Sequence, residues 1–136
     1  MAKSTGHCLC EGVRFTIDGD IGPAGYCHCE DCRRMTGSAF NISSPVALAG
    51  FALVSGKLGS FTKLGDRGNE LTRYFCLDCG SPIYTSAPKH AETIYVKCGV
   101  LDDPLLVQPV LEAWRDSKVT WAEIPQTVIT YPKGRS

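Results

Sequence analysis

Apolar and polar residues alternate over short stretches along most of this chain. Val13, Phe15 and Ile17 alternate with polar residues, which is typical of a strand with one buried face. Other short stretches are rich in β-branched or aromatic residues and are separated by Gly, Pro, Asp or Asn. They cover residues 26–29, 39–46, 52–55, 58–62, 69–75, 83–86, 93–98, 110–114 and 128–131. The exception is residues 33–37, which can form about one helical turn ended by Gly37. Short strands at this spacing predict an all-β fold, either a sandwich or an open barrel of antiparallel strands.

Length and charge narrow the class of protein. The 136 residues fit a single domain, residues 1–136, with one hydrophobic core. Lys plus Arg equals Asp plus Glu at 14 each, so no excess positive charge attracts phosphate, and we expect no nucleic acid partner. The first residues, MAKSTGHC, lack the apolar run of a signal peptide, and no stretch reaches the roughly 18 apolar residues of a membrane helix. We therefore expect a cytoplasmic protein without a membrane partner, and an exposed hairpin tip at residues 65–69.

The cysteines carry the candidate chemistry. They fall into two pairs, one triplet and one single residue: Cys8 and Cys10, Cys76 and Cys79, Cys27 with Cys29 and Cys32, and Cys98. A reducing compartment keeps thiols free, so a dense cluster there indicates a metal site rather than disulfides. Disulfides between cysteines so close in sequence would also close strained, very small loops. Zinc is the first candidate, because thiolates suit a tetrahedral ion, while iron-sulfur clusters usually have another cysteine spacing.

The spacing also divides the cysteines between sites. Residues two apart in a strand point to one face, and Gly80 allows the tight turn that aims Cys76 and Cys79 at one ion. We therefore predict two zinc ions per chain. One is held in a closed site by Cys8, Cys10, Cys76 and Cys79, and the other by the triplet Cys27, Cys29 and Cys32. Three protein ligands leave an open position, which is the pattern of catalytic zinc. Cys98 either closes this second site or, as we favour, is an inert core thiol.

Three segments resemble a known family. Residues 6–15 (GHCLCEGVRF), 27–40 (CHCEDCRRMTGSAF) and 75–84 (FCLDCGSPIY) closely resemble the glutathione-dependent formaldehyde-activating enzyme family, which includes centromere protein V, and the likeness continues at residues 99–104, 121 and 131–134. The resemblance implies an Mss4-like β fold held together by zinc. By position, the two pairs match the family's structural zinc ligands and the triplet matches its catalytic ligands. Two residues depart from the pattern: Glu11 replaces a usual glycine, and Cys98 replaces a small residue such as alanine.

The triplet also suggests a reaction. Three thiolates on Zn²⁺ leave a net charge of minus one, which suits the holding of another thiolate better than the polarising of a carbonyl. With the resemblance, this indicates a zinc-dependent carbon-sulfur lyase that forms or cleaves a thiol-aldehyde adduct such as S-hydroxymethylglutathione, from glutathione and a small aldehyde. Arg33 and Arg34 are candidates to offset the negative charge of the site or to bind a substrate carboxylate. His28 is expected to pack against or support the site rather than to act in catalysis.

Two other functions stay open from the sequence alone. One is a non-catalytic zinc-binding module that carries a thiol ligand or docks a protein partner, because a fold does not fix a function. A second site closed by Cys98 would favour this module. The other is a thiol redox enzyme that uses Cys98 as its nucleophile, which requires a thiol of low pKa.

Overall fold

The computed structural model describes residues 3–65 and 68–134, and β-strand is the main regular secondary structure within them. The strands in chain order are β1 (Lys3–His7), β2 (Arg14–Asp18), β3 (Ala24–Cys27), β4 (Asn41–Ala47), β5 (Phe51–Ser55), β6 (Leu58–Leu64), β7 (Glu70–Cys76), β8 (Pro82–Ser86), β9 (Thr93–Lys97), β10 (Pro109–Ala113) and β11 (Ile129–Thr130). One α-helix, α1 (Glu30–Thr36), lies between β3 and β4, and short 3₁₀ turns connect later strands. The predicted all-β fold is confirmed.

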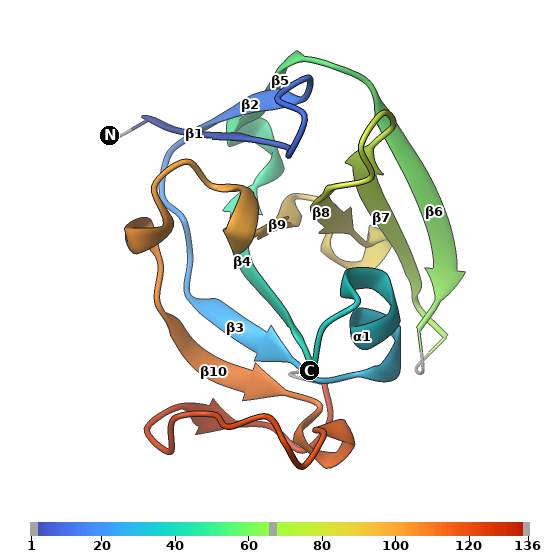
Figure 1. Ribbon diagram of the computed structural model, residues 1–136, viewed down its shortest axis with the longest axis vertical. Helices are drawn as coiled ribbons and strands as arrows, with labels where there is room; N and C mark the ends of the chain where they lie inside the picture. Colours follow the sequence, from blue (N-terminus) through green and yellow to red (C-terminus); the bar gives the residue numbers. More distant parts are fainter. Residues whose placement is uncertain (1–2, 66–67, 135–136) are drawn as a thin grey trace.

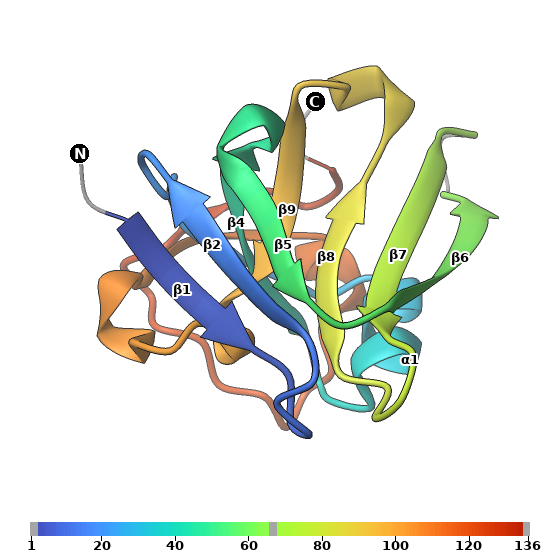
Figure 2. The ribbon, with the colours of Figure 1, turned by 90° about the horizontal axis from the view of Figure 1, so that it is seen from above.

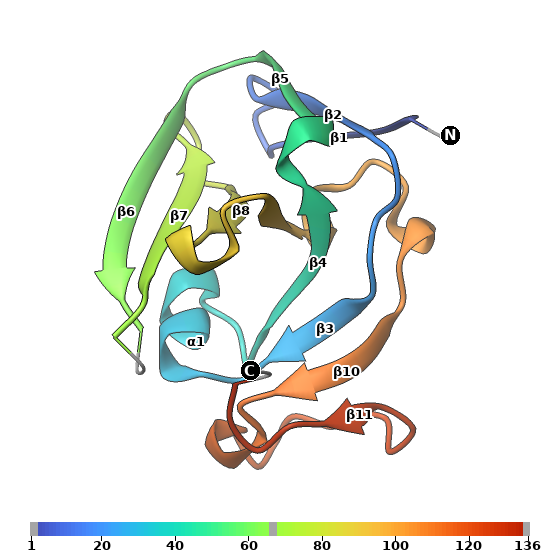
Figure 3. The same cartoon turned by 180° about the vertical axis from the view of Figure 1, so that it is seen from behind.

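The strands form two sheets. A small sheet has the order β1-β2-β5, and a large one has the order β11-β10-β3-β4-β9-β8-β7-β6. The large sheet curves strongly, so that β3 and β10 at one side and β6 and β7 at the other flank α1 (Figures 1 and 3). An ion pair of 2.5 Å between Lys63 on β6 and Asp31 on α1 joins the helix to the far end of the sheet. The small sheet lies across the opposite part of the molecule, as Figure 2 shows.

One part of the expected strand arrangement is different. Most pairs are antiparallel as predicted, but β10 runs parallel to both β3 and β11. Parallel neighbours need a long crossover between them, and the chain from β3 to β10 is long enough to supply it. The sheet is therefore mixed. Within the described part of the chain, no helix is long and apolar enough to cross a membrane.

Strand β1 was not predicted, because KSTGH has almost no apolar alternation. It forms because it pairs with β2 along its whole length. Gly6 makes this possible, since a Cβ atom there would lie only 2.2 Å from Cζ of Phe15. The predicted hairpin tip at residues 65–69 joins β6 to β7, and its Asp66 and Arg67 lie outside the described residues.

The core lies between the two sheets and includes two cysteines of the predicted closed metal site. The alternating residues Val13, Phe15 and Ile17 are all at most 1% exposed, as predicted. Cys8 and Cys76 belong to the same buried cluster, together with residues of β8 and β9. One cysteine from each pair is therefore part of the buried core.

Candidate metal centres and the adjoining pocket

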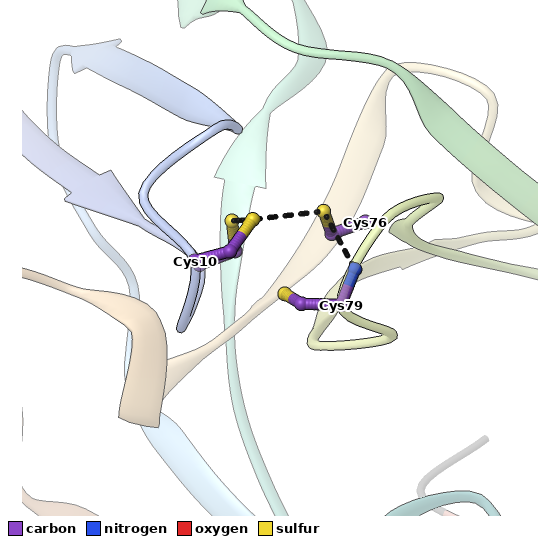
Figure 4. Close-up of side chains that lie close together, drawn as sticks. Cys10, Cys76 and Cys79 are labelled. Atoms are coloured by element: carbon purple, nitrogen blue, oxygen red, sulfur yellow. Dashed lines mark hydrogen bonds between the residues drawn. The ribbon is translucent and has the colours of Figure 1, made fainter.

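Four cysteine sulfurs from distant parts of the chain meet at one end of the core. Cys8 and Cys10 follow β1, Cys76 ends β7, and Cys79 lies in the turn before β8; their sulfurs are all within 4.8 Å of one another. Sγ of Cys10 is 3.5 Å from Sγ of Cys8 and 3.8 Å from Sγ of Cys76. Figure 4 shows Cys10, Cys76 and Cys79 approaching from two separate loops.

These distances fit a shared ion and do not fit a disulfide. Tetrahedral zinc with Zn–S bonds of about 2.3 Å separates its sulfurs by about 3.8 Å. A disulfide would require about 2.05 Å, and all eight cysteines, each within the described residues, are free. The four-cysteine group can therefore hold a tetrahedral metal ion with little rearrangement, which agrees with zinc.

The loops of this group are shaped by backbone hydrogen bonds to sulfur. The N–H groups of Val13 and Gly12 donate to Cys8 and Cys10 at 3.2 and 3.4 Å. Hydrogen bonds from Ser81 lower the pKa of Cys79 to about 5. Such bonds favour the thiolate, which is the form that binds metal. Glu11 adopts a φ of 66°, the conformation that glycine adopts at no steric cost, and so it keeps the turn that its glycine counterpart would form.

The triplet forms a second group of three sulfurs. Cys27 ends β3, Cys29 caps the N-terminus of α1, and Cys32 lies in its first turn; the three sulfurs are within 4.8 Å of one another. The N–H of Cys32 donates to Sγ of Cys29 at 3.3 Å. In the absence of metal, hydrogen bonds from the thiols of Cys27 and Cys32 lower the pKa of Cys29 to about 2. A thiolate at Cys29 is the form that binds a metal ion.

Helix α1 explains why the triplet is assembled. The predicted helical turn begins earlier than expected, at Glu30, because Cys29 caps it and Glu30 and Asp31 lie favourably in its first turn. The strand before it correspondingly ends at Cys27 rather than Cys29. Gly37 ends the helix in the left-handed conformation, as predicted. A strand end and a helix start thus bring the three thiols together.

Cys98 lies outside this group. It begins a 3₁₀ turn after β9, is buried, and its sulfur is 3.4 Å from Oγ of Ser44. Among the described residues, the second group therefore has three sulfurs and is not closed by Cys98. Burial raises the pKa of the Cys98 thiol, which opposes the redox hypothesis. The arrangement agrees with the favoured reading of an inert core thiol.

A pocket of about 660 Å³ opens beside the triplet. Cys27 and Cys32 contribute to its wall, while strands β3, β4, β8, β9 and β10 supply most of the remainder. Its aromatic lining comes from Tyr26, Tyr95, Trp114, Tyr131 and His90. The four-cysteine group does not line this pocket. A small molecule can therefore approach the three-sulfur group from here.

Arg33 and Arg34 do not line the pocket. Arg34 has a side chain that is 75% exposed and pairs with Glu30 at 3.1 Å. Arg33 is half-buried, and its Nε has no hydrogen-bond partner within residues 3–65 and 68–134. Contact of either arginine with a substrate stays a prediction.

His28 lies between two of the triplet cysteines and is fully buried, which agrees with the predicted packing or supporting role. Its Nε2–H donates to Oε1 of Glu112 at 2.8 Å. Glu112 also accepts hydrogen bonds from Arg115 at 2.7 Å and Thr130 at 2.8 Å. Burial would raise the pKa of Glu112, but the hydrogen bonds from Thr130, His28 and Arg115 outweigh it and lower that pKa. Glu112 was not predicted from the sequence, although a single carboxylate inside the apolar run of residues 110–114 was a signal.

Two buried cations near the triplet were also missed. Lys97 on β9 is 8% exposed and Arg73 on β7 is 6% exposed. Burial lowers the pKa of Lys97, although the negative charge of Cys32, Cys27 and Cys29 opposes this effect. Positive charge at Arg73 contributes to the low pKa of Cys29. Alternation in β7 and β9 gave no signal, because a polar residue between apolar ones usually faces water.

The fold and its sites define a class: a β protein with two separate cysteine groups that can hold metal ions. A family model described as "Glutathione-dependent formaldehyde-activating enzyme" matches residues 3–117, and the chain therefore belongs to that family. A crystal structure of a Rhodobacter sphaeroides protein is similar, with a TM-score of 0.58 and 24% identity over 72% of this chain and 87% of that one. At that identity, the likeness supports the fold alone. A search of curated proteins found no match.

Proposed function

We propose that this protein is a zinc-dependent carbon-sulfur lyase that forms or cleaves a thiol-aldehyde adduct of the S-hydroxymethylglutathione type. The observation that carries the proposal is the three-cysteine group, which has no fourth sulfur among the described residues and borders a pocket of about 660 Å³. Membership of the family supports glutathione as the thiol and formaldehyde as the aldehyde.

The two cysteine groups have different roles in this proposal. Cys8, Cys10, Cys76 and Cys79 hold a structural zinc ion, and Cys27, Cys29 and Cys32 hold a catalytic one. When bound at the triplet, zinc supplies a positive centre that favours the thiolate form of a neighbouring thiol. Eight free thiols also suit a reducing compartment, and we place the protein in the cytoplasm.

The remaining chemistry belongs to the pocket. Tyr26, Tyr95 and Trp114 provide apolar walls for the body of the thiol, and Asn41 and Ser43 provide hydrogen-bonding groups. Held there, the thiol loses its proton, its sulfur forms a bond to the carbonyl carbon, and the carbonyl oxygen gains a proton. The reverse reaction breaks the carbon-sulfur bond and returns thiol and aldehyde. Holding both reactants in one cavity accelerates addition through proximity.

The test compares Cys29→Ser with the control Cys98→Ala. We expect Cys29→Ser to abolish formation and cleavage of the adduct, followed by NMR with isotope-labelled formaldehyde, while the circular dichroism spectrum is kept. Cys98→Ala should retain turnover, because its sulfur lies outside both groups. A wild-type protein with two zinc ions that turns over none of several thiol and aldehyde pairs would contradict the proposal.

A further inference from the structure

The strand register places a set of polar side chains on the sheet face that carries Cys27. Cys27 on β3 pairs with Asn41 on β4, and Ser43 on β4 pairs with Lys97 on β9. Residues directly opposite each other in neighbouring strands share a face, and so do residues two apart in one strand. Cys27, Asn41, Ser43 and Lys97 therefore face the same side. The first three of them line the pocket.

The same rule brings Arg73 to this face from the other end of the sheet. Arg73 on β7 pairs with Thr85 on β8, and Thr85 pairs with Tyr95 on β9. Tyr95 is two residues before Lys97, so both belong to the face that carries Cys27. Thr85 and Tyr95 line the pocket as well. Two cations from different strands thus lie on the sheet face that carries both the pocket and Cys27.

Among the described residues, these cations have no carboxylate partner. Nζ of Lys97 donates to Oδ1 of Asn41 at 2.8 Å, which is a contact with a neutral group. Within residues 3–65 and 68–134, neither Lys97 nor Arg73 forms an ion pair with Asp or Glu. Burying an unpaired cation is costly, so a negative charge is needed nearby. The thiolates of the triplet provide it, since their charge acts on Lys97 and the charge of Arg73 acts on Cys29.

We infer that Lys97 and Arg73 balance the charge of the three-cysteine centre, so that the pocket accepts its thiol substrate as an anion. This inference rests on the proposed function and deepens it. Three thiolates and one divalent ion carry a charge of minus one, and a substrate thiolate brings the total to minus two. The two cations offset this total. They are positioning residues that act through the cysteines, because neither lines the pocket.

The experiment measures thiol binding rather than turnover. Calorimetry on the zinc-loaded protein compares the wild type with Lys97→Met, Arg73→Met and the charge-retaining Lys97→Arg. The probes are 2-mercaptoethanol, which has no carboxylate, and glutathione, which has two. Exposed Lys89 supplies a matched control, Lys89→Met. We expect each loss of a buried cation to lower the affinity for both thiols by about tenfold, which is the size of effect that a charge interaction across a short distance has. Lys97→Arg and Lys89→Met should bind as the wild type does.

A further variant tests the same inference in case the Met variants fail to fold. Asn41→Asp nearly preserves the shape of the side chain and puts a carboxylate oxygen where Nζ of Lys97 already donates. It should therefore lower the affinity for both thiols without removal of a side chain. Unchanged affinity in the Met variants and in Asn41→Asp would overturn the inference. So would a loss confined to glutathione, because it would mean that the cations bind its carboxylates. A wild type that binds no thiol would remove the proposed function and this inference together, whereas thiol binding that is equal in all variants removes the inference alone.

Discussion

Glu112 is expected to be a main determinant of stability around the triplet. Its side chain is 1% exposed and accepts hydrogen bonds from His28, Arg115 and Thr130. Glu112→Gln keeps the shape but leaves one acceptor oxygen, and its amide N–H groups would face donors. Hydrogen bonds to a charged group contribute roughly 1.5–3 kcal/mol each, and breaking a buried ion pair costs roughly 3–5 kcal/mol. We expect a loss of about 3 kcal/mol in the free energy of unfolding.

Urea and thermal unfolding of the zinc-loaded protein at neutral pH measure this loss. For a chain of this length, about 3 kcal/mol lowers Tm by roughly 10 °C. Arg115→Met should cost only about 1 kcal/mol, because its side chain is 48% exposed and water can replace it. We also expect Glu112→Gln to weaken metal retention by Cys27 and Cys29, since His28 lies between them. A loss below about 1 kcal/mol in Glu112→Gln would refute the reasoning, because three hydrogen bonds to a buried carboxylate would then contribute no more than one surface pair.

Two further predictions concern metal and pH. Cys76→Ser should lower the zinc content by one ion per chain and destabilise the fold by at least about 3 kcal/mol, because this buried sulfur belongs to both the metal group and the core. The control is metal analysis of Cys98→Ala, which should keep two ions. An unchanged zinc content in Cys76→Ser would argue against the closed site. The pKa of Glu112 is lowered from 4.5, so its contribution is complete above that pH and is lost as the pH falls through its lower value in the folded protein. The difference in unfolding free energy between wild type and Glu112→Gln should therefore narrow as the pH falls below about 4.5, and a difference that stays constant down to pH 3 would contradict this role.

The strands with one apolar face could be predicted because burial requires side chains to alternate. Val13, Phe15 and Ile17 show this directly, since all three became core residues. Strand β1 could not be predicted in the same way. It depends on Gly6, which lets the backbone approach Phe15, and that contact does not exist until the two strands pair. Pairing across the sheet, rather than local preference, determines such a strand.

The same distinction between local pattern and tertiary pairing applies to the candidate site. Cysteine spacing indicated two groups of sulfurs and a set of three with an open position, because ligands close in sequence can reach one ion whatever the rest of the fold. Lys97 and Arg73 gave no comparable signal, since a charged residue in a strand usually faces water, and Glu112 gave only that of a single carboxylate inside an apolar run. Lys97 and Arg73 lie on the face that carries Cys27, inside the curve of the large sheet, whereas Glu112 lies on the opposite face with His28, Arg115 and Thr130 as its partners. The sequence by itself thus determined the metal-binding chemistry, whereas the tertiary structure decided which charges surround it, because burial depends on which strands become neighbours.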